Sequence, residues 1–168
     1  MSLAIQFYIR QLLLFFTICV FSMSLYLQYV EHFLPCPLCI MQRLCVLILL
    51  LFFIAQCMIK RLQAMVYCVI PLIISSCGLF FALRQINLQW WGTAAPHMCL
   101  PSLQVLMTRM PWHATMSALL WGGSDCAEST GKWLGLELPQ WAAGYFILIL
   151  LGTIVYAATI CLHQDKQA

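Results

Sequence analysis

The chain of 168 residues is 64% hydrophobic and only 8% charged, with eight Lys and Arg residues against five Asp and Glu. Soluble domains carry about 25% charged residues, so this composition excludes a soluble globular domain and predicts an integral membrane protein. The net charge of +3 comes from scattered residues that form no basic stripe, which argues against nucleic-acid binding.

Four apolar segments are predicted to cross a membrane as helices, because about 20 mostly apolar residues span the hydrocarbon core. In chain order they cover roughly residues 12–29, 41–59, 64–83 and 141–162. We therefore expect an all-α membrane protein in which residues 1–168 form one four-helix bundle. An even number of spans places both termini on one side. The short connection 30–40 and the long connection 84–140 then share the other side.

The distribution of positive charge predicts the orientation of this bundle. Arg10 precedes the first segment, and Lys60 and Arg61 fill the very short connection between the second and third segments. Short loops rich in Lys and Arg remain in the cytoplasm, whereas long loops cross largely regardless of their charge. We therefore expect cytoplasmic termini, with the 30–40 and 84–140 connections on the outer side.

The ten cysteines fall into two groups. Six lie inside apolar segments, where a free cysteine is expected to act as a small buried hydrophobic residue; they are Cys19, Cys45, Cys57, Cys68, Cys77 and Cys161. The other four lie in or beside the two outer connections, and they are Cys36, Cys39, Cys99 and Cys126. The second group is the candidate for thiol chemistry.

Cys36 and Cys39 form a C-x-x-C pair at the start of the second segment. A dithiol at this spacing can close a small disulfide. Pro37 suits the opening turn of a helix, so Cys39 is expected in the first turn, where free N–H groups favour a thiolate. Arg43 follows four residues later on the same helical face, where its charge would stabilise an anion on sulfur or on a bound, reduced organic acceptor.

More ordinary interpretations of the C-x-x-C pair and Arg43 exist. Arg43 at the end of a span can simply extend its side chain to the headgroups, and the pair can be a static disulfide or half of a zinc site. Zinc would need a second pair or suitably spaced histidines, and His32 and His97 show no such pattern. We therefore predict no metal site.

Cys99 and Cys126 lie in turn-like settings within the long connection. A disulfide between them would restrain this loop as a structural staple. Alternatively, the two cysteines share one side of the membrane with the C-x-x-C pair, so the two pairs can exchange by thiolate attack. The residues alone leave both interpretations open.

Two stretches of the sequence resemble a known family. Residues 35–43, Pro-Cys-Pro-Leu-Cys-Ile-Met-Gln-Arg, resemble the first-loop motif of the disulfide bond formation protein B (DsbB) family. Gly-Ser-Asp-Cys-Ala-Glu at 123–128 and residues 133–141 resemble the family's second loop and its entry into the last span. The resemblance covers most of the chain, with both motifs in the family's order.

This resemblance implies an inner-membrane thiol:quinone oxidoreductase that reoxidises a periplasmic DsbA-like thiol oxidase and reduces ubiquinone or menaquinone. It implies that Cys99 and Cys126 form the pair facing the oxidase, with Cys99 as the sulfur attacked. Cys36 would then exchange with Cys99. The resemblance further implies that Cys39 contacts the quinone while Arg43 stabilises the developing charge.

Gln85 departs from the family pattern, because many members have a histidine just after the arginine that ends the third span. A glutamine can donate a hydrogen bond to a quinone oxygen, but it cannot carry a proton. Two alternative functions remain beside the resemblance. One is a vitamin-K-epoxide-reductase-like quinone reductase, whose C-x-x-C would be expected at a late span. The other is a non-enzymatic membrane adaptor with structural disulfides.

Overall fold

The computed structural model describes residues 2–30, 36–58, 64–91 and 135–165, with 132–133 and four positions between 112 and 120. Its long helices are α1 (Ser2–Tyr29), α2 (Pro37–Met58), α3 (Ala64–Trp91) and α6 (Leu138–Asp165). Each contains a stretch long and apolar enough to cross a membrane. The predicted four-helix membrane fold is therefore confirmed.

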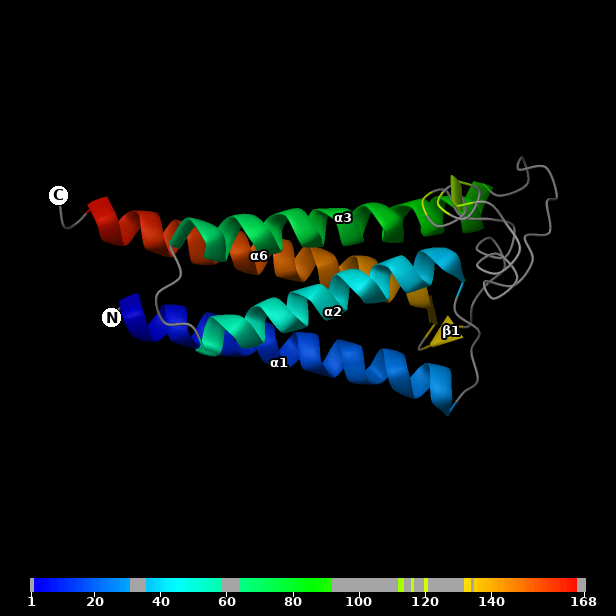
Figure 1. The fold of residues 1–168 in the computed structure, drawn as a ribbon, viewed down its shortest axis with the longest axis horizontal. Coiled ribbons are helices and arrows are strands. Elements are labelled where there is room, and N and C mark those ends of the chain that lie inside the picture. The colour runs from blue at the N-terminus through cyan, green and yellow to red at the C-terminus, as the bar shows by residue number, and fades with distance from the viewer. Residues whose placement is uncertain are drawn as a thin grey trace.

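The four helices pack in a closed ring, with α1 against α2, α2 against α3, α3 against α6 and α6 against α1. Figure 1 shows that α1 begins and α6 ends at the same end of the bundle. At the other end, which we call the loop end, α2 starts close to where α3 finishes. Exposed Tyr29, Trp91 and Trp141 lie at the loop end, as expected for aromatic side chains at a membrane–water interface.

The bundle core lies between the helices, and large apolar side chains also cover the outer surface, where lipid would contact them. The core includes the fully buried Leu38, Leu49, Phe146 and Ile149. Gly78 of α3 lets this core close, because a Cβ atom there would lie 2.2 Å from the Phe146 ring of α6. Small residues at helix contacts allow such close approach in membrane proteins.

The helix ends differ from the predicted spans. Residues 84–91, predicted as part of the long connection, form the last two turns of α3, and residues 37–40, predicted as part of the short connection, form the first turn of α2. Helix α1 also begins at Ser2 rather than near residue 12. The predicted spans end where the sequence stops being apolar. The backbone hydrogen bonds of a helix do not depend on apolar side chains, so α3 continues through polar residues such as Arg84 and Gln85.

A short hairpin precedes α6. Strand β1 (Lys132–Trp133) pairs antiparallel with β2 (Leu136–Glu137), and Gly135 adopts a φ of +83° in the turn between them. The Glu137 N–H then donates a hydrogen bond to Gln140 Oε1 at 3.2 Å, which caps the first turn of α6. Residues 135–141 of the family-like motif thus form the entry to the last span.

Candidate active site

The thiol pair lies at the N-terminus of α2. Pro37 is the first helical residue, and the Ile40 N–H donates to the Cys36 carbonyl at 3.1 Å. The Cys39 N–H donates to the Cys36 sulfur at 3.4 Å, so the Cys36 side chain caps the helix. The motif was predicted to start a helix with N–H groups favouring a thiolate at Cys39. The helix start is confirmed, the Cys39 N–H donates to the sulfur of Cys36, and the thiolate at Cys39 stays a prediction.

The two sulfurs of the C-x-x-C pair lie 3.0 Å apart, with Cys36 buried and Cys39 half-buried. Their separation is about 1 Å longer than a disulfide bond, so the pair can interconvert between dithiol and disulfide without moving a helix. The pair lies at the loop end, where the membrane-spanning stretch of α2 begins.

Gln85 of α3 is fully buried against the thiol pair. Its Nε2 lies 3.1 Å from the Cys39 sulfur and 3.4 Å from the Cys36 sulfur. Its Oε1 accepts a hydrogen bond from Gln42 Nε2 at 2.8 Å and lies 3.4 Å from the Cys39 sulfur. The extension of α3 beyond residue 83 is what brings Gln85 to the site.

Arg43 contributes positive charge to the same site. Its half-buried guanidinium interacts electrostatically with Cys39 and Cys36, and its Nη1 donates a hydrogen bond to Gln28 Oε1 of α1. The side chain is therefore held between two helices rather than extended freely toward the headgroups.

Gln28 and Gln42 were not among the predicted site residues. Each is an uncharged polar residue inside one of the predicted spans, and that was the signal available in the sequence. In a membrane such a side chain is expected to face the bundle interior and find a polar partner. Both do so, Gln28 with Arg43 and Gln42 with Gln85.

The remaining cysteines divide differently from the prediction. Cys99 and Cys126 lie outside the described residues, so their pairing stays a prediction. Cys45 was predicted to be buried, and the structure confirms this. Its thiol interacts with that of Cys77 on α3. Others are exposed on the bundle surface, and these are Cys19, Cys57 and Cys77. The prediction of burial was wrong for these three, because lipid is as apolar as the core and accepts a thiol equally well.

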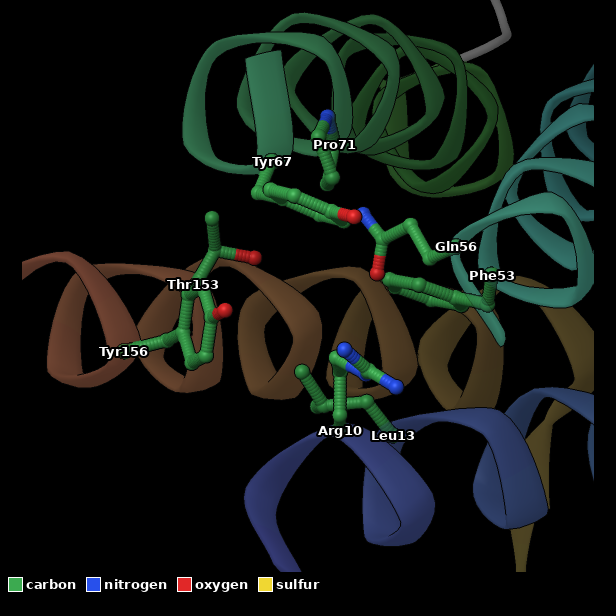
Figure 2. A pocket seen from close by; sticks show the side chains of 8 residues that line it. All are labelled: Arg10, Leu13, Phe53, Gln56, Tyr67, Pro71, Thr153 and Tyr156. Carbon is green, nitrogen blue, oxygen red and sulfur yellow. The ribbon is translucent and has the colours of Figure 1, made fainter. Parts of the chain in front are cut away.

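A second polar cluster lies at the opposite end of the bundle, and its side chains come from all four helices (Figure 2). Arg10, Gln56, Tyr67, Thr153 and Tyr156 are among the residues that line a cavity of about 10 Å³, which is room for one water molecule. No cysteine lines this cavity. Among the described residues, two neighbouring sulfurs with a buried amide against them lie at the loop end.

The comparison with known proteins decides the family. The family model described as disulfide bond formation protein DsbB matches residues 8–156, which is most of the chain. The chain belongs to the DsbB family. Its relatives include the disulfide bond formation protein B of Stutzerimonas stutzeri, 32% identical over 149 residues that cover 85% of this chain and 84% of the relative.

Other relatives of this DsbB-family protein show similar agreement. Disulfide bond formation protein B 1 of Pseudomonas aeruginosa is 32% identical over 87% of this chain and 93% of its own length. The protein of Chromohalobacter salexigens is 34% identical over 77% of this chain and 78% of its own length. No solved structure matches the chain significantly.

Membership in the DsbB family agrees with the predicted resemblance rather than with a vitamin-K-epoxide-reductase-like protein or an adaptor. Together with the four spans, it makes the chain a multi-pass membrane protein of disulfide bond formation, with the disulfide oxidoreductase activity that the family implies.

Proposed function

We propose that this DsbB-family protein is a thiol:quinone oxidoreductase that reoxidises a periplasmic DsbA-like thiol oxidase and passes the electrons to a membrane quinone. The observation that carries the proposal is the loop-end site. Two sulfurs 3.0 Å apart share one buried amide, and the Arg43 cation interacts electrostatically with both.

The outer pair would receive electrons from the oxidase by thiol–disulfide exchange. A thiolate of the reduced oxidase attacks the Cys99 sulfur of a Cys99–Cys126 disulfide and releases Cys126 as a thiolate. The second oxidase thiol then displaces Cys99. The oxidase leaves as a disulfide, and Cys99 and Cys126 hold the two electrons and two protons.

The inner pair would take over these electrons in the same way. The Cys99 thiolate attacks Cys36 of a Cys36–Cys39 disulfide, and Cys39 is released. Cys126 then attacks Cys99, which restores the outer disulfide and leaves Cys36 and Cys39 as a dithiol. Each exchange breaks one disulfide and forms one, so no further oxidant is needed before the last step.

The residues around the inner pair support its anionic form. The Cys36 sulfur accepts hydrogen bonds from the Cys39 N–H and from the Gln85 amide. Arg43 adds a positive charge, and its hydrogen bond to Gln28 holds it in place. Hydrogen bonds to an anion are roughly twice as strong as neutral ones, especially where water is excluded. This environment makes each sulfur a better leaving group and keeps the reduced pair reactive.

The same residues fit the carbonyl oxygens that ubiquinone and menaquinone share. A guanidinium has five N–H donors, of which the bond to Gln28 uses one, and Gln85 contributes an amide N–H. A bound quinone supplies the two-electron acceptor, taking the two electrons and two protons that the dithiol loses as it closes to a disulfide. Gln85 does not titrate, so those protons do not come from its side chain.

A Cys99→Ala variant tests the proposed route. Oxidation of the DsbA-like partner should be lost, while quinone reduction with dithiothreitol as donor should persist, since a small dithiol can reach Cys36–Cys39 directly. If Cys99–Cys126 is only a staple, both donors lose activity together and the melting temperature falls. That outcome would end the relay proposal.

We further propose an inner-membrane orientation with cytoplasmic termini and periplasmic cysteine loops, on the basis of the Lys60–Arg61 loop. A cysteine introduced as Gln167→Cys should react with a membrane-impermeant maleimide only after cells are lysed. Labelling of that position in intact spheroplasts that keep their inner membrane sealed would reverse the orientation.

A further inference from the structure

Two buried glutamines face each other beside the thiol pair. Gln42 of α2 is 6% exposed and Gln85 of α3 is 0% exposed. Gln42 donates through Nε2 to Gln85 Oε1 at 2.8 Å, which is the shortest contact that Gln85 makes in the site. Buried amides need hydrogen-bond partners, and here the Gln85 amide contacts both sulfurs as well as Gln42.

The orientation of the Gln85 amide decides whether a hydrogen-bond donor or an acceptor faces the two sulfurs. An amide presents a donor at its NH₂ end and an acceptor at its oxygen, and the two ends have nearly the same shape. With Oε1 held by Gln42, the Nε2 end reaches the Cys36 sulfur at 3.4 Å and the Cys39 sulfur at 3.1 Å. The oxygen also lies 3.4 Å from the Cys39 sulfur, where a protonated thiol can donate to it.

We propose that Gln42 is a positioning residue that holds the Gln85 amide with its Nε2 toward Cys36 and Cys39 and thereby favours the thiolate form of the pair. The inference rests on the proposed function only in taking this pair as redox-active. Gln42 touches neither sulfur in the hydrogen bonds described, so its effect passes through Gln85.

The physical reason is the different response of sulfur to the two ends of the amide. A thiolate accepts hydrogen bonds, so the NH₂ end stabilises it, whereas the oxygen end would place lone pairs against a negative charge. Without Gln42 both orientations become available to Gln85. Because neither amide titrates, the stabilisation persists across the whole pH range in which the thiols ionise.

The test measures thiolate reactivity in the full-length protein and needs no quinone and no partner. The protein is reduced with dithiothreitol in detergent micelles, desalted and treated with iodoacetamide, and mass spectrometry follows each cysteine separately. Methionine is the chosen replacement because it has nearly the length of glutamine and cannot donate. We expect Gln85→Met to slow alkylation of the Cys36–Cys39 pair about tenfold at neutral pH, the value of one hydrogen bond to a charged group.

Gln42→Met should slow the same reaction by about threefold, because Gln85 still visits the donor orientation part of the time. Both deficits should vanish at a pH at which all thiols are ionised, which separates thiolate stabilisation from access of the reagent. In the double variant Gln42→Met/Gln85→Met, the rate should equal that of Gln85→Met alone, because Gln42 acts only through Gln85.

Gln56→Met is the matched control. Gln56 lies on the same helix and is 3% exposed, but it faces the cavity at the opposite end. This variant should leave the alkylation rates unchanged. If Gln42→Met lowers the melting temperature more than Gln56→Met does, Gln42→Asn, whose shorter side chain cannot reach Gln85, is measured instead with the same expectation.

Three results would overturn the proposal: an unchanged alkylation rate in Gln42→Met, additive effects in the double variant, or an equal deficit in Gln56→Met. The proposed function has a separate readout, which is quinone reduction by the unsubstituted protein. Absence of that activity alongside the expected alkylation pattern would reject the quinone but keep the positioning role of Gln42.

Discussion

Helix α2 buries one glutamine near each of its ends, and the two have different surroundings. Gln42 and Gln56 are 14 positions apart, about 21 Å along the helix axis, and both are almost fully buried. Gln42 bonds a second amide that contacts two thiols, whereas Gln56 shares a water-sized cavity with Arg10 and Tyr67. Figure 2 shows Gln56 among side chains from all four helices. The same residue type on the same helix therefore serves different purposes, decided by what the neighbouring helices bring to it.

The largest expected effect is on quinone reduction, and it separates a cysteine of the C-x-x-C pair from a cysteine that only packs in the bundle. Cys39→Ser should abolish quinone reduction, because a serine cannot close the disulfide whose formation from the dithiol releases the two electrons. Cys45→Ala, six residues further along α2 and away from the C-x-x-C pair, should retain most of its turnover. Steady-state assays with excess quinone check both. Near-normal turnover in Cys39→Ser would remove this cysteine from the proposed mechanism, and lost turnover in a well-expressed Cys45→Ala would enlarge the site.

The second prediction concerns the helix contact between the two ends. Gly78→Ala should lower the free energy of unfolding by about 1–3 kcal/mol, because the added methyl group would overlap the Phe146 ring and push α3 from α6. Gly144→Ala is the control, since nothing lies within 4 Å of a Cβ atom there. Thermal melts in micelles compare the two. Equal melting temperatures would contradict the close α3–α6 approach.

The third prediction compares the two arginines. Arg43→Ala should raise the quinone concentration at half-maximal rate about tenfold, the value of one hydrogen bond to a charged group, while the disulfides still form. Arg10→Ala, at the other end of the bundle, should leave that concentration unchanged. If Arg43→Ala instead misfolds and its surviving fraction binds quinone normally, Arg43 is only a membrane anchor.

The smallest expected effect lies midway between the ends, where the Tyr145 hydroxyl donates to Thr17 Oγ1 at 3.0 Å and joins α6 to α1. Thr17→Val should cost about 0.6 kcal/mol, the average value of an interhelical hydrogen bond in a membrane protein. Thr159→Val is the control, because the Thr159 hydroxyl bonds the Tyr156 carbonyl of its own helix. Activity should be unchanged in both variants, and a large loss of activity in Thr17→Val would show that this contact transmits structure to the thiol site.

Much of this architecture was determined by local composition. Four long apolar segments require four spans, and an even number of spans brings the 30–40 and 84–140 connections to one end. The Pro-Cys-Pro-Leu-Cys motif predicted the start of a helix at the thiols, since proline is tolerated in a first turn. The structure confirmed the four spans and the helix start at Pro37, because neither depends on which helices are neighbours.

The contacts within the site were decided only by the tertiary structure. The sequence placed Gln85 beyond the end of a span, and it offered no reason to join Gln42 to Gln85 or Arg43 to Gln28. These contacts depend on how far each helix continues past its apolar segment and on its rotation and axial position against its neighbours. Close packing sets the rotation and axial position of each helix, at contacts such as Gly78 against Phe146. The hydrophobic pattern of the sequence does not reveal them, because lipid and core are equally apolar.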